Sequence, residues 1–175
     1  MKRLLTLSVI CILLLSLGVS CKLIMKLFFK TGVTFDSESF EKEYQLWKKR
    51  NCNDYSFVFY DSTSYDCGEK FKVAVYNDLD EYDSLDENKK QRYAEKIKSM
   101  EDVFEYVKEL ETYLEKSSAK TNDVHFTFTM DFDEIYHFPK KIHVSTQHKD
   151  WDLGTKGGYW ETIEVEDFAL SKHKI

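Results

Sequence analysis

The chain has 175 residues, of which 42% are hydrophobic and 15% aromatic, with only one proline and six glycines. This composition supplies enough apolar side chain for one core and argues against a disordered or low-complexity protein. The formal net charge of −6 argues against a nucleic-acid partner, because binding to phosphates requires a basic surface. We therefore expect one folded domain behind an N-terminal leader.

The first 20 residues have the pattern of an export signal. Lys2 and Arg3 precede an apolar run from Leu4 to Leu17, which at about 1.5 Å per residue is too short to span a bilayer comfortably. The run ends in Leu17-Gly18-Val19-Ser20-Cys21, which resembles a bacterial lipoprotein box. The resemblance implies a signal peptide over 1–20, a diacylglycerol on Cys21 and a lipid-anchored tether over 21–36.

Two other interpretations of the leader stay open. Cleavage after Ser20 by an ordinary signal peptidase would release a soluble, secreted domain. Alternatively the leader stays uncleaved, because residues 22–30 are apolar apart from Lys22, Lys26 and Lys30. These three lysines share one helical face, as in segments that lie in a membrane interface. All three interpretations predict an exported domain, and the lipid anchor predicts one that faces the periplasm or the cell surface.

Cys52 and Cys67 remain in the chain after the leader is removed. An even pair of cysteines in an oxidising compartment is typical of a disulfide. A bond between them would close a loop of about 15 residues and contribute about 3 kcal/mol to stability in the chain-entropy model. The two residues flank the first predicted strand, which is compatible with a structural Cys52–Cys67 disulfide, and the sequence leaves open whether they are bridged.

The period of the apolar residues changes along the chain and predicts a mixed fold. Phe40, Tyr44 and Trp47 recur at helical spacing, as does the apolar stripe from Met100 to Leu114, whereas residues 55–60 alternate as in a strand. The predicted elements are a helix over 37–50, strands over 55–60 and 71–76 joined by a loop over 61–69, helices over 85–97 and 100–116, and strands over 125–130, 141–145 and 160–168.

These elements predict a single α+β domain over residues 37–175. Their order, α-β-β-α-β-β-β, implies an antiparallel sheet of about five strands with two or three helices packed on one face.

Several short motifs occur in one order between residues 38 and 169. They are Trp47 in a helix, Tyr55-Ser56-Phe57 in a strand, Cys67, Val73-Ala74-Val75-Tyr76-Asn77, Asp102-Val103-Phe104, Phe132 to Pro139, and Ile163 to Phe168. In this order they resemble a family of small bacterial putative lipoproteins that share a domain of unknown function. The family pattern has glycine where this chain has Asp78 and His137, both positions that favour a positive φ. The resemblance implies a fold and an envelope location, and no activity.

Four histidines occur late in the chain: His125, His137, His143 and His148. His125 and His143 would lie near each other if their two strands pair, and Asp131 or Asp133 could then join them around a zinc ion. The spacing of these residues matches no common zinc motif. We therefore predict no metal site and no cofactor.

The sequence carries none of the common catalytic signatures: it has no Gly-x-Ser-x-Gly, no His-Glu-x-x-His and no phosphate-binding glycine loop. We therefore predict a non-catalytic binding or scaffold domain. The alternative is a small hydrolytic or metal-dependent enzyme that uses His125, His143 and Asp133.

Aromatic side chains supply the candidate partner-binding residues. Trp151 lies among charged residues in the loop over 148–154, as interface anchors often do, although a loop tryptophan that folds back onto the domain explains it equally well. Tyr136 and Phe138 would extend this surface, and Trp160 begins the last strand. We expect these four residues to bind an unidentified envelope protein or component, while lipid on Cys21 binds the membrane. A purely structural spacer remains a third interpretation, in which Trp151→Ala would change no interaction.

Overall fold

The computed structural model describes residues 29–63, 66–76, 79–84, 96–149 and 158–171. The predicted signal peptide, the predicted lipidation site Cys21, most of the helix predicted over 85–97, Asp78 and Trp151 lie outside these ranges.

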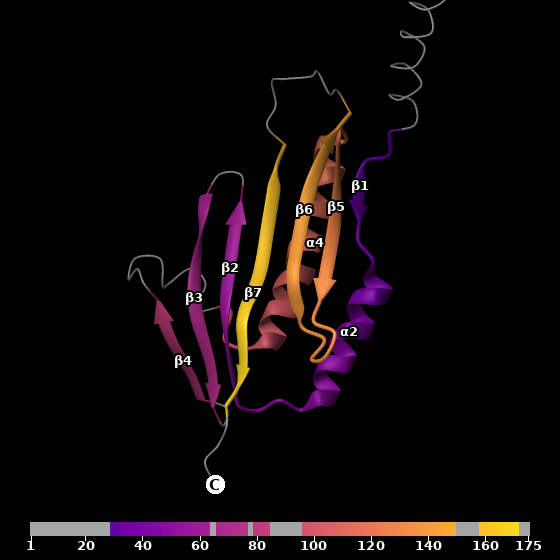
Figure 1. Ribbon diagram of the computed structural model, residues 1–175. Helices are drawn as coiled ribbons and strands as arrows, with labels where there is room; N and C mark the ends of the chain where they lie inside the picture. The colour runs from indigo at the N-terminus through magenta and orange to yellow at the C-terminus, as the bar shows by residue number, and fades with distance from the viewer. Residues whose placement is uncertain (1–28, 64–65, 77–78, 85–95, 150–157, 172–175) are drawn as a thin grey trace, which may run out of the picture.

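The described residues form one sheet with both helices on the same face (Figure 1). The elements are β1 (Gly32–Thr34), α2 (Ser37–Arg50), β2 (Tyr55–Thr63), β3 (Asp66–Tyr76), β4 (Leu79–Ser84), α4 (Met100–Thr121), β5 (Val124–Phe132), β6 (Pro139–His148) and β7 (Trp160–Leu170). The seven strands lie in the order β1-β5-β6-β7-β2-β3-β4. Every neighbouring pair is antiparallel except β1 and β5, which are parallel.

The predicted α+β class is confirmed, but the sheet is larger than predicted. β1 and β4 are additional strands, and most of the loop predicted over 61–69 is instead strand, since β2 runs to Thr63 and β3 begins at Asp66. The domain also begins earlier than predicted. Residues 32–36, assigned to the tether, form β1 and the cap of α2, and Phe35 packs against Phe128.

Helix α2 has the predicted bounds because its signals are local. The carboxylate of Asp36 accepts a 3.0 Å hydrogen bond from the backbone N–H of Ser39, which satisfies one of the free donors of the first turn. Asn51 ends the helix with a left-handed backbone at φ 50°. The predicted stripe of Phe40, Tyr44 and Trp47 is buried.

Helix α4 is longer than its apolar pattern predicts. Ser99 caps its start by accepting a hydrogen bond from the N–H of Asp102, and Asn122 ends it at φ 51°. The apolar stripe stops at Leu114, whereas the helix continues to Thr121. The last turns are polar and partly exposed, so the hydrophobic period does not report them.

The core lies between the two helices and the inner face of the sheet, where aromatic rings meet. The rings of Phe40 and Phe104 lie 5.4 Å apart, and those of Trp47 and Tyr55 also lie 5.4 Å apart. Fully burying one such side chain contributes about 1.5–3 kcal/mol. The other face of the sheet carries mostly small polar and charged side chains, and Figure 1 shows no helix in front of it.

The sequence allows a Cys52–Cys67 disulfide, and the structure contradicts it. Cys52 is a free, half-buried thiol. Tyr55 pairs with Val75 at one end of the β2–β3 hairpin, and Thr63 pairs with Asp66 at the other. Cys52 and the backbone of Cys67 therefore lie at opposite ends of the hairpin, about 25 Å apart along the strands, whereas a disulfide requires Cα atoms within about 7 Å.

The sheet has two ends along the direction of its strands. We name one of them the tether end, because the described chain starts there at Phe29. Two hydrogen bonds join the segments at this end: the hydroxyl of Thr31 donates to Asn122 at 3.2 Å, and the N–H of Lys149 donates to the carbonyl of Asp123. The opposite end carries the last turn of α2, the β5–β6 turn and the end of β7 (Figure 1). The ten residues of β6 connect the two ends over about 30 Å.

Candidate functional site

The histidines that could have formed a metal or catalytic site do not converge. His125 faces Gln147 across the β5–β6 ladder, and His143 faces Thr129, so the two histidines are offset by four residues, about 13 Å. His125 Nε2 lies 2.9 Å from the hydroxyl of Thr34, and His143 Nδ1 lies 3.0 Å from that of Thr162. Each ring thus has its own partner.

Asp133 lies far from both rings, in the turn after β5. Its side chain binds backbone N–H groups of that turn. Across the described part of the chain, no three His, Cys, Asp or Glu side chains are grouped so that they could hold a metal ion. The residues that the enzyme alternative requires are therefore separated by the fold.

The predicted partner-binding aromatics are also separated. Trp160 is 41% exposed and lies on the uncovered face of the sheet, opposite Ser145. Tyr136 lies near the start of β6, about 20 Å away along the strand. Phe138 is 4% exposed and belongs to the core, so its assignment to a binding surface is wrong.

The β5–β6 turn, residues 133–138, is held by a dense set of hydrogen bonds. Asp133 Oδ1 accepts from the N–H groups of Ile135 and Tyr136 at 2.9 and 2.7 Å. The backbone of Asp133 also donates to Phe138 O at 2.8 Å and accepts from His137 N at 2.9 Å. Few turn conformations satisfy all four bonds, so the turn is rigid.

His137 fixes this turn to helix α2. Its backbone has φ 67°, a left-handed conformation that glycine adopts more readily than histidine. Its Nδ1 lies 2.8 Å from Glu43 Oε2 on α2, and the two side chains are only 19% and 17% exposed. The contact positions the turn relative to the rest of the domain.

We give the name distal tip to four apolar residues of the turn and of the end of β7: Ile135, Tyr136, Phe168 and Leu170. Ile135 is 61% exposed and Leu170 is 44% exposed. The ring centroids of Tyr136 and Phe168 lie 5.0 Å apart, which connects the turn to the end of β7. The distal tip thus combines two exposed aliphatic side chains with a half-buried aromatic base.

A β-bulge in β7 places Phe168 in this surface. The register of β2 and β7 shifts between Ser56 and Val58, and Asp167 has φ 51°. The extra residue turns Phe168 toward the helices, where it packs 4.6 Å from Phe138 and 5.8 Å from Trp47. Regular alternation from Trp160 would have placed Phe168 on the opposite face of the sheet.

Positive charge lies beside the distal tip, at the end of α2. Lys48, Lys49 and Arg50 occupy its last turn and are exposed. The ammonium of Lys48 lies 3.9 Å from the centre of the Tyr44 ring, which limits its motion. Trp47 in the same turn packs on Phe168, so this basic turn borders the apolar surface.

A cluster of buried polar side chains lies between α4 and the sheet, toward the tether end. Asp61 and Glu161 are 3% and 2% exposed. The hydroxyl of Tyr106 on α4 lies 2.6 Å from Asp61 Oδ2 and 3.2 Å from Glu161 Oε1, and the hydroxyl of Tyr159 donates to Glu161 as well. Hydrogen bonds of this kind offset the cost of burying carboxylates, and here they join α4 to β2 and β7.

Sequence reasoning missed these buried acids. Asp61 was assigned to a loop, and no face of its strand was predicted for Glu161. The alternation of Glu161, Ile163 and Val165 is the signal that places Glu161 inside, since all three share one face.

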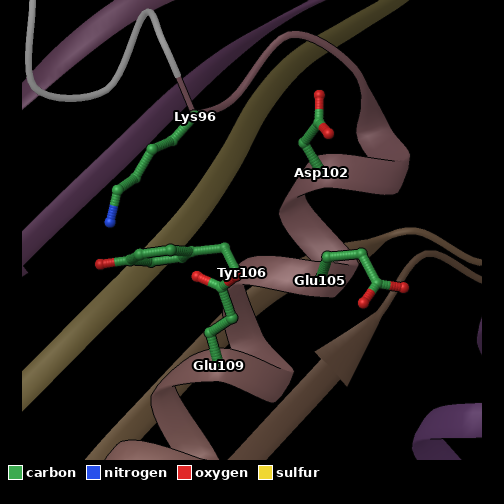
Figure 2. A pocket seen from close by; sticks show the side chains of 5 residues that line it. All are labelled: Lys96, Asp102, Glu105, Tyr106 and Glu109. Carbon is green, nitrogen blue, oxygen red and sulfur yellow. The ribbon is translucent and has the colours of Figure 1, made fainter.

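A hollow of about 200 Å³ lies beside this cluster, along the first turns of α4. Figure 2 shows its lining side chains: Lys96, Asp102, Glu105, Tyr106 and Glu109. Two of its acids have structural partners, because Asp102 accepts from the backbone of Lys98 and Glu105 accepts from the hydroxyl of Tyr44. This arrangement stabilises the start of α4 and brings no nucleophile and base together.

Burial shifts the ionisation of two groups near the distal tip. It raises the pKa of the Cys52 thiol, which keeps the thiol protonated and unreactive. It also raises the pKa of the Tyr55 hydroxyl, with a smaller contribution from the neighbouring carboxylate of Glu101. Neither shift produces an activated nucleophile at neutral pH.

Neither helix within the described ranges is both long and apolar enough to cross a bilayer. Comparison with known proteins assigns no relative: no family model matches the chain, and no curated protein sequence matches it.

Proposed function

We propose that this chain is an exported, lipid-tethered binding domain. In this proposal a lipid on Cys21 holds the domain at a membrane, and the distal tip binds a second envelope protein without catalysing a reaction. The order of motifs that resembles small putative lipoproteins supports the location. The geometry of the β5–β6 turn supports the binding role.

The exposure of Ile135 on a rigid turn is the observation that carries this proposal. A large aliphatic side chain that is 61% exposed leaves most of its apolar surface in contact with water. The turn beneath it is fixed by two backbone–backbone hydrogen bonds, by two backbone N–H groups that donate to the Asp133 carboxylate, and by the His137–Glu43 contact. A preorganised side chain loses little entropy on binding, which favours its use as an interface anchor.

The proposed tether leaves the distal tip accessible. Seven residues separate Cys21 from Phe29, so the tether end lies no more than about 28 Å from the lipid, whatever conformation those residues take. The distal tip lies about 30 Å farther along the strands. A lipid anchor therefore holds the domain close to the membrane without obstructing the tip.

The chemistry of the distal tip indicates the kind of partner. Ile135 and Leu170 fit an apolar pocket, and the neighbouring Lys48, Lys49 and Arg50 favour acidic residues around that pocket. We therefore propose a protein partner with an apolar pocket and an acidic rim.

Site-specific crosslinking in the native membrane tests the binding role. A photo-crosslinking residue at Glu134, an exposed position beside Ile135, should give a discrete adduct that disappears when Ile135→Asp is added. The matched control is Tyr113, 66% exposed on α4, where Tyr113→Asp should leave the adduct at 134 unchanged. An adduct that survives Ile135→Asp would contradict the proposal and favour a spacer.

Intact mass and detergent partitioning test the tether separately. The mature protein should carry the mass of the acyl chains and partition with detergent, whereas Cys21→Ala should remain unprocessed. A mass equal to that of the full chain would indicate an uncleaved anchor. A cleaved, unmodified product in the aqueous phase would indicate secretion.

A further inference from the structure

The tether end of the domain is basic, although the chain as a whole carries a net charge of −6. Lys30 precedes β1, Lys116 and Lys120 lie in the last turns of α4, and Lys149 follows β6. The Thr31–Asn122 and Lys149–Asp123 hydrogen bonds place Lys30, Lys120 and Lys149 at the same end of the sheet. Segments far apart in the sequence thus place their lysines together.

These four lysines are available for an external anion. Lys30, Lys116, Lys120 and Lys149 are all exposed, and none forms an ion pair with another residue in the described ranges. The acids nearest to them in the chain are Glu115, Asp123 and Asp150, of which Asp150 lies outside the described residues. One carboxylate oxygen of Asp123 is buried, which removes part of that charge from the surface. Cations therefore dominate the described surface at this end.

The lysines lie where a tethered domain must approach its membrane. A domain with net negative charge is repelled by an anionic bilayer, yet a tether of at most about 28 Å prevents it from moving away. The repulsion is lowest when the basic end faces the lipid. Each lysine near such a surface is attracted by it, and the attraction declines over about one Debye length.

We propose that the tether end is a docking surface for anionic phospholipid headgroups. This inference rests on the proposed tether and adds an orientation to it. Lys30, Lys116, Lys120 and Lys149 contact the headgroups, the strands stand away from the bilayer, and the distal tip points toward solvent. The lipid thus determines where the domain is, and the four lysines determine which way it faces.

Hydrogen exchange of the full chain in lipid nanodiscs tests this docking surface. The mature protein is compared in nanodiscs of phosphatidylcholine alone and in nanodiscs that also contain phosphatidylglycerol. Anionic lipid should slow exchange by about fivefold or more at residues 29–32, 119–123 and 148–149, as expected for one lysine held at the headgroups. Raising the ionic strength from about 0.15 to about 1 M shortens the Debye length to about 3 Å and should abolish the protection.

Two variants with the same net charge distinguish the effect of where the lysines lie from the effect of the net charge. Lys→Gln at 30, 116, 120 and 149 should abolish the lipid-dependent protection. Lys→Gln at 42, 72, 96 and 98, which are exposed elsewhere on the domain, should leave it unchanged. Both variants should keep the melting temperature of the wild type, because none of the eight lysines is buried.

The outcomes distinguish the inference from the proposed function. Acylated protein that shows equal exchange with neutral and anionic lipid overturns the docking surface and leaves the tether intact. Equal loss of protection in both variants also overturns it, because net charge alone would then explain the effect. Protein without acyl mass overturns the lipid tether. If the uncleaved leader anchors the protein instead, protection of these residues by anionic lipid would still support the docking surface.

Discussion

The indole Nε1 of Trp47 donates a 2.7 Å hydrogen bond to Glu101 Oε1, and this contact links the last turn of α2 to the first turn of α4. The other oxygen of Glu101 accepts from the hydroxyl of Tyr55, at 3.4 Å. That hydroxyl in turn accepts the backbone N–H of Met100 at 3.0 Å, so it satisfies a donor at the start of α4. One carboxylate therefore connects both helices to the sheet.

Removing this carboxylate should destabilise the domain. Glu101→Ala leaves the buried indole N–H of Trp47 without its acceptor, so we expect a loss of about 1–3 kcal/mol in the free energy of unfolding. Glu109→Ala is the matched control, since Glu109 is exposed on the same helix, and should cost no more than about 0.5 kcal/mol. Urea denaturation of both variants measures the difference, and equal midpoints would contradict the assigned role of Glu101.

Tyr55 should make stability depend on pH in the alkaline range. Burial raises the pKa of its hydroxyl in the folded state, and Glu101 adds to the shift. The contribution of this group is therefore complete below the unfolded pKa of about 10 and declines as the pH rises toward the folded pKa. Above pH 10 the unfolding free energy of the wild type should fall more steeply than that of Tyr55→Phe, by about 1.4 kcal/mol per pH unit. Parallel curves for the two proteins would show that Tyr55 does not retain its proton on folding.

The Tyr106 hydroxyl should contribute to stability through the two buried acids. Tyr106→Phe removes a donor that lies within hydrogen-bond distance of Asp61 and Glu161, and we expect a loss of about 1–3 kcal/mol. Tyr113→Phe, on the exposed side of the same helix, should change stability by less than about 0.5 kcal/mol. Thermal or urea unfolding gives both values, and a neutral Tyr106→Phe would show that the hydroxyl is not needed to bury the carboxylates.

Cys52 should remain a reduced thiol in the folded protein. The fold separates it from Cys67, so peptide mapping without reduction should find no linked Cys52–Cys67 peptide. Because burial raises its pKa, alkylation of the native protein should be slow at neutral pH and should accelerate at alkaline pH and in denaturant. A linked peptide from folded protein would show that the β2–β3 register is different.

The helices and the main strands could be predicted because their signals are local. Asp36 and Asn51 mark the ends of α2, and Phe40, Tyr44 and Trp47 lie one helical turn apart between them. The hydrophobic period and the capping residues depend only on nearby residues, so they can be recognised without knowledge of the rest of the chain. The added strands carry no such signal: β1 has three residues, and β4 is an acidic strand with little alternation.

The candidate surface could be predicted only in part. The sequence directed attention to Tyr136 and Phe138, but Phe138 is buried and the exposed anchor is Ile135. The direction of each side chain depends on the left-handed backbone of His137 and on the contact of that residue with Glu43, 94 positions earlier. A property shared by residues so far apart does not appear in a local pattern.

By itself, the sequence determined the fold class, most of the helices and strands, and the apolar stripes that form the core, because hydrophobic period acts over short segments. Only the tertiary structure decided that Cys52 and Cys67 lie apart, that Asp61 and Glu161 meet at Tyr106, and that Phe168 joins Tyr136. Each of these outcomes follows from strand register or from a β-bulge. Register is chosen by the packing of the whole sheet against α2 and α4, because a shift of one residue would exchange the buried and exposed faces of a strand.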